Sequence, residues 1–277
     1  MKSRKVAFVT GASRGIGRAC AIALAEAGYD VAVAARTMVD GSARLDDGVT
    51  AVPGGLDTTL QEIQQRGQQG YVIEMDLLDR GSVLAAADAI YDHFGQINVL
   101  VNNAIYQGLG AMLPFKELED RYLSLLFEGN LFAHIALIRH LLPAFVTQGG
   151  ATVINMISAT AFTDPPGKIG AGGWGVGYAM TKAAFERVAP LLMVEHGEEG
   201  IVAYNIDPGH VVTERQKIRR KDKEYTAFPS APPEVIGAAV AWIVDDPEAP
   251  SQYGGKICNA QREVKKRGLL PEWSENL

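Results

Sequence analysis

The sequence has few of the residues that mark a disulfide-stabilised protein or a metal site. Only two of its 277 residues are cysteines, Cys20 and Cys258, which excludes a disulfide framework and a cysteine-based metal site. The five histidines show no metal-ligand spacing either. We therefore expect a protein without a bound metal.

Excess basic charge and long apolar runs are also missing. The formal net charge is −6, whereas general nucleic-acid binding requires a basic face. The basic residues 1–5 precede an apolar run of only four residues, too short for a signal peptide, and no stretch reaches the length expected of a membrane span. Hydrophobic residues at 47% and charged residues at 21% are ordinary for a globular protein. We expect one cytoplasmic, enzyme-sized domain, residues 1–277, that contacts neither membrane nor nucleic acid.

The sequence does contain a regular alternation of strand-like and helical patterns. Continuous apolar strands separated by helices are typical of a parallel sheet covered on both faces, so the predicted fold class is α/β and doubly wound. Pro190 should kink or shorten the helix in which it falls. Strands are expected at 5–10, 31–35, 71–75, 98–102, 152–157, 201–206 and 255–259, and helices at 18–28, 56–69, 82–94, 121–148, 178–195 and 233–244.

Four segments do not fit this alternation. Residues 37–55 and 160–177 carry Gly, Asp and Pro without a clear period and are expected to be inserted loops. Residues 211–230 form a polar segment, and 260–277 a polar C-terminal tail. In doubly wound sheets ligands bind beyond the carboxyl ends of the strands, so functional residues should follow strands directly.

A glycine-rich stretch, TGASRGIG at residues 10–17, joins the first predicted strand to the first predicted helix. Glycines at a strand-to-helix turn let the backbone approach a phosphate, and the helix N-terminus then faces the anion with unpaired N–H groups. This context, more than the glycines themselves, predicts a dinucleotide-binding loop.

Tyr178 and Lys182 are four residues apart at the start of a predicted helix and so lie on one face of it. A free phenol has a pKa near 10, and a neighbouring ammonium is expected to bring that pKa toward the neutral range. The pair is therefore a candidate for general acid–base chemistry.

These motifs, together with Asn102-Asn103-Ala104-Ile105 and Asp207-Pro208-Gly209, resemble the short-chain dehydrogenase/reductase family over residues 5–259. The resemblance implies a single Rossmann-type domain with about seven strands in the order 3-2-1-4-5-6-7 and a substrate lid near 211–230. It also implies a catalytic set in which Tyr178 transfers the proton, Ser158 orients the substrate oxygen, Lys182 tunes Tyr178 and Asn130 anchors a proton relay. The cofactor-binding residues implied are Gly11, Ser13, Arg14, Gly15, Ile16, Gly17, Arg36, Thr37, Asp76, Leu77, Asn103, Ala104, Tyr178, Lys182, Pro208, Gly209, Val211 and Thr213.

The end of the second strand favours NADP(H) over NAD(H). NAD-binding sites usually place a carboxylate there for the ribose 2′-hydroxyl, whereas this chain has Ala35 followed by Arg36. A guanidinium suits a 2′-phosphate, and Arg14 in the glycine loop is placed to clamp it from the other side. Asp76 is expected against the adenine ring, although Asp76, Asp79 and Ser82 all compete for the capping of the following helix.

The sequence departs from the family pattern at Ile105, where glycine is usual, and in the long separation of Ser158 from Tyr178. The leading hypothesis is an NADP(H)-dependent oxidoreductase (EC 1.1.1.-) that interconverts a carbonyl and a secondary alcohol. Two alternatives stay open: a non-catalytic NADP(H)-binding sensor or scaffold, and a reductase of acyl-CoA thioesters. The second of these depends on the basic run at 215–223, for which a solvated lid helix is the more common explanation. Pairing of helices 121–148 and 178–195 is expected to give a homodimer or homotetramer.

Overall fold

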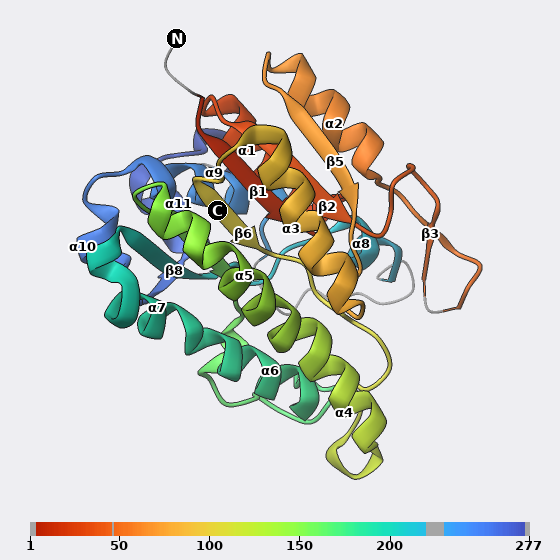
Figure 1. Cartoon of the computed structure of the whole chain (residues 1–277). Coiled ribbons are helices and arrows are strands. Elements are labelled where there is room, and N and C mark those ends of the chain that lie inside the picture. The colour runs from red at the N-terminus through yellow and green to blue at the C-terminus, as the bar shows by residue number, and fades with distance from the viewer. Residues whose placement is uncertain (1–3, 46, 220–229, 275–277) are drawn as a thin grey trace.

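The computed structural model describes residues 4–45, 47–219 and 230–274. Within them a parallel sheet of seven strands has the order β5-β2-β1-β6-β7-β8-β9 (Figure 1). Numbered by their sequence among these seven strands alone, this is the predicted order 3-2-1-4-5-6-7, which is thereby confirmed. The strands are β1 (Val6–Thr10), β2 (Asp30–Ala35), β5 (Gly70–Glu74), β6 (Val99–Asn102), β7 (Ala151–Met156), β8 (Ile201–Asp207) and β9 (Ile257–Asn259).

Successive residues of each strand point to opposite sides of the sheet, so a continuous apolar strand makes both faces apolar. Helices cover both of these faces. On β1, Ala7 and Val9 join one apolar cluster, whereas Phe8 between them joins the other. The first cluster is completed by α1 (Gly15–Glu26), α2 (Leu56–Gln65), α9 (Pro233–Asp245) and α11 (Ala260–Arg267). The second is completed by α3 (Arg80–Phe94), α5 (Ala133–Thr147) and α7 (Val188–His196), and α3 and α5 are seen running side by side in Figure 1.

The long helix expected at 121–148 is present and contains a π-helical turn in its middle. It consists of α4 (Asp120–Phe127), a π-helical turn at Glu128–Phe132, and α5. Asn130 lies in the π-helical turn, and its side chain bonds the backbone of Tyr106 in both directions: Oδ1 accepts from the Tyr106 nitrogen at 2.7 Å and Nδ2 donates to the Tyr106 oxygen at 3.1 Å. Such π-helical turns are frequent at functional sites, where they re-aim the helix.

This helical stretch also corrects the expectation that no segment could span a membrane. By length and composition alone, Asp120–Thr147 is long and apolar enough, with a mean hydropathy of 1.3 over the best window. Of that window, 56% is buried inside the fold. A core helix that packs against a sheet passes the same test, so the finding is weak support for a membrane span.

The helix expected at 178–195 is broken, as predicted from Pro190. It consists of two helices, α6 (Val176–Glu186) and α7, which are separated at Arg187. Pro190 lacks the N–H that would bond the carbonyl of Glu186 four residues earlier. The Asn205 side chain on β8 donates to that carbonyl instead, at 2.7 Å. A residue of the sheet therefore completes the hydrogen bonding of the broken helix.

Two segments expected to be irregular contain regular structure. Residues 37–55 form a small antiparallel hairpin of β3 (Ala43–Arg44) and β4 (Ala51–Val52). The C-terminal tail forms α11 and α12 (Pro271–Ser274); Asn259 caps α11 by accepting from the Arg262 nitrogen, and Gly268 ends it with φ 63°. Asn259 is a residue type typical of a helix N-cap and Gly268 one typical of a helix stop, so the sequence contained both signals for α11. The first helix likewise begins earlier than expected, at Gly15, and α2 ends earlier, at Gln65.

The remaining short elements lie in the connections around the site. They are α8 (Glu214–Arg219), α10 (Ala249–Tyr253) and the 3₁₀ turns Phe115–Glu117, Ala159–Ala161 and Gly197–Glu199. The second expected insertion, 160–177, begins within the Ala159–Ala161 turn. It then has no strand or helix until Val176 and has one isolated bridge, between Ile169 and Gly173.

Candidate active site

A pocket of about 320 Å³ opens beyond the carboxyl ends of the strands, where ligands bind in doubly wound sheets. The structure brings the predicted cofactor residues together around it, except that Gly209 and Val211 do not line it. Of the four predicted catalytic residues, Tyr178 and Lys182 line the pocket, whereas Ser158 and Asn130 do not. Among the described residues, no group of three His, Cys, Asp or Glu side chains could hold a metal ion.

The glycine loop is closely packed at the N-terminus of α1. Gly11 has φ 68°, and a Cβ added there would lie 2.7 Å from the Cα of Ala104. A Cβ on Gly17 would lie 2.3 Å from the carbonyl oxygen of Gly11, so only glycine fits either position. Arg14 at the N-cap makes no side-chain capping bond, so the N-terminus of α1, which faces the pocket, is not capped by its own N-cap residue.

The asparagines at the end of β6 tie the strand ends together. Asn103 Nδ2 donates to the carbonyl of Thr10 at 2.9 Å, and Asn102 Nδ2 donates to Oδ1 of Asn155 at 3.1 Å. The Thr10 hydroxyl accepts from the backbone nitrogens of Asn103 and Ala104, both at 3.0 Å. These bonds hold the glycine loop against the β6 end, where Ile105 lines the pocket in place of the usual glycine.

The competition for capping α3 is resolved in favour of Asp79. Its Oδ1 accepts from the Ser82 nitrogen at 3.1 Å. Asp76 Oδ1 instead accepts from the Leu78 nitrogen at 3.0 Å, and Asp76 lines the pocket together with Leu77. Asp76 therefore lies at the pocket and does not cap α3, and its role against the adenine ring stays a prediction.

Tyr178 does not have the lowered pKa expected from its lysine neighbour. Burial raises the pKa of the Tyr178 hydroxyl, a hydrogen bond from the Ser158 side chain opposes this, and the charge of Asp207 raises it further. The net direction is upward. Ser158 also accepts from the Thr160 nitrogen at 3.3 Å, so the hydroxyl serves both its own turn and the tyrosine.

Lys182 is buried beneath Tyr178 and is bonded elsewhere. Its Nζ donates to the carbonyl of Met156 at 2.6 Å and lies 6.0 Å from the centroid of the Tyr178 ring. Burial lowers the pKa of Lys182 to about 8. No hydrogen bond joins Lys182 to the Tyr178 hydroxyl in the described part of the chain. This explains why the expected lowering of the tyrosine pKa is absent. The predicted role of Asn130 beside Lys182 stays a prediction, because its side chain is used on Tyr106.

The charged side chains that line the pocket are five cations and one carboxylate. Two of the cations, Arg44 and Arg215, were not predicted as cofactor residues, and neither were Tyr106 and Gln107 after the β6 end. Neither arginine lies in a motif of the family, so the sequence offered no motif that predicts a cofactor role for them. The number of basic residues in these two segments was the one available signal. The full set is Arg14, Arg36, Arg44, Lys182 and Arg215, with Asp76 as the carboxylate.

The predicted lid at 211–230 is described in part. Val211 pairs with Ala231 in an isolated bridge and is buried, which explains why it does not reach the pocket. Thr213 and Arg215 do reach it. Residues 220–229 of the lid, with much of the basic run at 215–223, lie outside the described residues.

Comparison with known proteins agrees with this geometry. Residues 5–224 match the family model described as short chain dehydrogenase. The chain is 30% identical to "Short chain dehydrogenase mpl6" of Monascus purpureus, covering 94% of this chain and 82% of that protein. It is also 30% identical to the 3-oxoacyl-[acyl-carrier-protein] reductase FabG of Staphylococcus aureus, over 77% of each chain. An alcohol dehydrogenase of Thermococcus sibiricus, solved with 5-hydroxy-NADP, superposes with a TM-score of 0.69 at 25% identity, covering 92% of this chain and 95% of that one.

The chain therefore belongs to the short-chain dehydrogenase/reductase family, whose oxidoreductases bind a nicotinamide cofactor. The residues present fit such a dinucleotide: an anion-binding helix N-terminus, a glycine loop without room for side chains, and a surplus of cations share one pocket.

Proposed function

We propose that this protein is an NADP(H)-dependent oxidoreductase that interconverts a carbonyl and a secondary alcohol. The observation that carries the proposal is the position of Tyr178, which shares a hydrogen bond with Ser158, at the end of the cation-lined pocket. A hydroxyl pair at this point can hold one substrate oxygen and move a proton to or from it.

The arginines support NADP(H) over NAD(H). Ala35 supplies no carboxylate at the end of β2, and the exposed Arg36 follows it directly at the pocket. A guanidinium binds a phosphate group more strongly than a hydroxyl because both partners carry charge. The Thermococcus sibiricus neighbour was solved with an NADP derivative, which supports the same preference.

The residues divide the proton chemistry among them. A bound nicotinamide would supply or accept the hydride. Ser158 orients the substrate oxygen, and Tyr178 gives or takes the proton at that oxygen. Because burial and Asp207 raise the pKa of Tyr178, its hydroxyl stays protonated at neutral pH and is a proton donor.

Replacing Tyr178 with Phe tests the assignment. Turnover of ketones should fall by about 10²–10⁴-fold, the usual contribution of a general acid, whereas the Kd for NADPH should change by less than about threefold. Tyr91→Phe on α3, far from the pocket, is the matched control and should keep full activity. Near-normal turnover in Tyr178→Phe would contradict the role of this residue. NADPH binding without turnover over a panel of ketones would instead favour the sensor alternative.

We also propose that the chain forms a homo-oligomer through its paired long helices. Leu125 and Phe132 are exposed on the α4–α5 stretch, and Met180, Leu191 and Val194 are exposed on α6 and α7, which lie beside that stretch in Figure 1. Val194 is 84% exposed. Apolar side chains gathered on neighbouring helices mark a contact surface. Sedimentation of Val194→Glu should show a smaller species than the wild type.

A further inference from the structure

The inserted hairpin, residues 37–55 with β3 and β4, forms one side of the pocket. Three of its residues line the pocket: Ala43, Arg44 and Val52. Arg44 pairs with Ala51 and Ala43 with Val52 across the two strands, so these side chains come from the centre of the hairpin. Val52 is buried, whereas the Arg44 side chain is exposed. An arginine is thus the polar contribution of this segment to the site.

The base of the hairpin is fixed to the glycine loop by Arg14. Its Nε donates to the carbonyl of Pro53 and its Nη2 to the carbonyl of Gly54, both at 2.8 Å. Gly54 has φ 103°, and a Cβ added there would lie 2.5 Å from the carbonyl oxygen of Ser13. The two backbones are therefore in direct contact. Two of the donors that were expected to clamp a 2′-phosphate are used on the hairpin.

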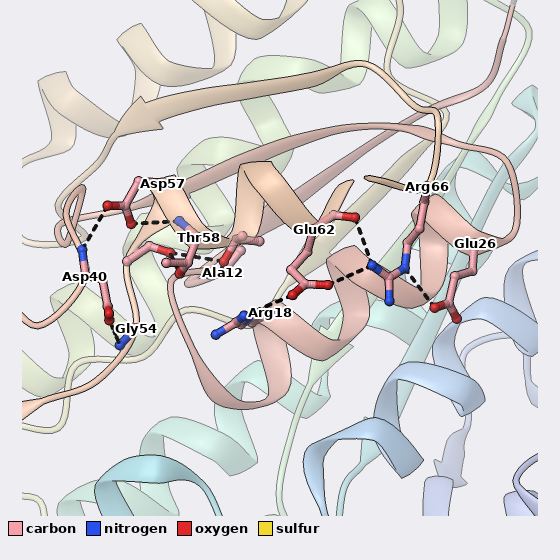
Figure 2. Close-up of polar contacts among 11 residues, drawn as sticks. Ala12, Arg18, Glu26, Asp40, Gly54, Asp57, Thr58, Glu62 and Arg66 are labelled. Carbon is pink, nitrogen blue, oxygen red and sulfur yellow. Dashed lines mark hydrogen bonds and ion pairs between the residues drawn. The ribbon is translucent and has the colours of Figure 1, made fainter. Parts of the chain in front are cut away.

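Further bonds hold the hairpin to the start of α2 (Figure 2). Asp40 Oδ1 accepts from the Gly54 nitrogen at 2.5 Å, and the Asp40 nitrogen donates to Asp57 Oδ2 at 3.1 Å. Behind them the buried Thr59 hydroxyl donates to the carbonyl of Ala12 in the glycine loop at 2.8 Å. Ion pairs of Arg18 with Glu62 and of Arg66 with Glu26 join α1 to α2. The hairpin is thereby built onto the cofactor loop.

Arg44 is held in place but keeps donors for a ligand. Its Nη1 donates to the carbonyls of Gly41 and Ala43, at 2.6 and 2.9 Å. No bond of its Nε or Nη2 is recorded among the described residues. Arg36 is exposed at the same pocket, also without a recorded hydrogen bond or ion pair in the described part of the chain. Two guanidinium groups with open donors therefore face a pocket with a single carboxylate.

We infer that the inserted hairpin is a wall of the adenosine end of the cofactor site and that Arg44, with Arg36, binds the 2′-phosphate of NADP(H). Arg14 is then a positioning residue that holds the hairpin in place. The inference rests on the proposed NADP(H) use. A phosphate monoester carries close to two negative charges and accepts several hydrogen bonds, so two arginines suit it better than one.

Binding of adenosine fragments tests the inference without requiring a substrate. The probes are 2′,5′-ADP, which carries the 2′-phosphate, and 5′-AMP, which does not. Arg44→Gln should raise the Kd for 2′,5′-ADP and NADPH by about 5- to 30-fold, as expected for a lost charge-assisted hydrogen bond. It should leave the Kd for 5′-AMP and NADH within about twofold. Arg44→Lys should restore part of the loss, and Arg121→Gln on α4 is the matched surface-charge control.

Hydrogen exchange separates the ligand from the positioning residue. Arg14→Gln should speed exchange at the hairpin amide of Leu45, which bonds the carbonyl of Thr50, whereas Arg44→Gln should not. If Arg36→Gln loses selectivity for 2′,5′-ADP and Arg44→Gln does not, the role of Arg44 is overturned and the NADP(H) preference stands. If the wild type binds 2′,5′-ADP no better than 5′-AMP, the cofactor preference falls, and the inference falls with it.

Discussion

Glu214 Oε2 lies 3.0 Å from the backbone nitrogen of Gly15 and accepts its hydrogen bond. Gly15 is the first residue of α1, so this N–H belongs to the helix N-terminus that would receive a cofactor phosphate. Glu214 begins α8, and the adjacent Thr213 lines the pocket. The Glu214 carboxylate, from the predicted lid, therefore occupies the position at the glycine loop where a cofactor phosphate would bind.

The first prediction is that Glu214→Gln tightens cofactor binding. A diphosphate at Gly15 must displace the carboxylate and is repelled by its charge, whereas the neutral amide competes less. The Kd for NADPH should fall by about 3- to 10-fold, as expected for one charge at a helix N-terminus. Fluorescence titration measures this. Glu234→Gln, an acid in the first turn of α9 outside the pocket, is the matched control. An unchanged or higher Kd in Glu214→Gln would show that the carboxylate does not compete.

The second prediction is that Lys182→Met stabilises the protein while removing its activity. Burial lowers the pKa of Lys182 to about 8, so the folded state binds the proton of this group less tightly than the unfolded state does. The resulting penalty is fully present below pH 8 and disappears as the pH rises to the ordinary lysine value near 10.5. Removing the amine should raise the free energy of unfolding at pH 7 by about 1–3 kcal/mol, the penalty less the lost bond to Met156.

Urea unfolding of both proteins at several pH values checks this prediction. Between pH 7 and pH 9.5 the wild type should gain about 2 kcal/mol relative to Lys182→Met. Other groups that titrate in this range cancel in the difference. Parallel pH dependences would contradict the lowered pKa, and a less stable Lys182→Met protein would mean that the bond to Met156 outweighs the penalty.

The sequence predicted the strands and their burial because both follow from local patterns, whereas the strand order was implied by the family resemblance. Apolar runs, the glycine turn and Pro190 determine the structure of residues close to them in the sequence. The strands, the strand-to-helix turn and the helix break predicted from them are confirmed in the fold. The hairpin at 37–55 was missed because its short strands are fixed by Arg14 and Asp57, which lie outside β3 and β4. No period within the segment could show those contacts.

The electrostatics of the site were missed for the same reason. The spacing of Tyr178 and Lys182 places both on one helix face, but it does not show how deeply each is buried. Burial moves the two pKa values in opposite directions, upward for the phenol and downward for the amine. The contact of Lys182 with the Met156 carbonyl depends on how α6 packs on β7, which only the fold determines.

The third prediction concerns Asn205, whose side chain replaces the hydrogen bond that Pro190 cannot make. Asn205→Ala should lower the free energy of unfolding by about 1–3 kcal/mol, because it leaves the Glu186 carbonyl without this donor. In a Pro190→Ala background the alanine N–H can bond the same carbonyl, so Asn205→Ala should cost about 1 kcal/mol less. Denaturant unfolding of the four proteins gives the coupling. Equal costs in both backgrounds would show that the two residues act independently.

The fourth prediction concerns His134, a buried residue of α5. Its Nε2 lies 3.0 Å from the carbonyl oxygen of Ala104, which can only accept, so Nε2 carries a proton. Nδ1 is buried and has no hydrogen-bond partner within the described residues. The ring stacks on Phe185, with the centroids 4.9 Å apart. Burial, together with the charge of Lys182, lowers the pKa of His134 to about 3.

A histidine kept neutral by the fold makes the protein sensitive to acid. The unfolded state binds the proton near pH 6.5 and the folded state near pH 3, so stability is complete above pH 6.5 and is lost progressively as the pH falls toward 3. Relative to His134→Gln, the wild type should lose about 2–3 kcal/mol of unfolding free energy between pH 7 and pH 4.5. Carboxylates that titrate in this range are common to both proteins and cancel. If the two proteins lose stability in parallel, the ring accepts its proton inside the fold, and the neutral state of His134 is wrong.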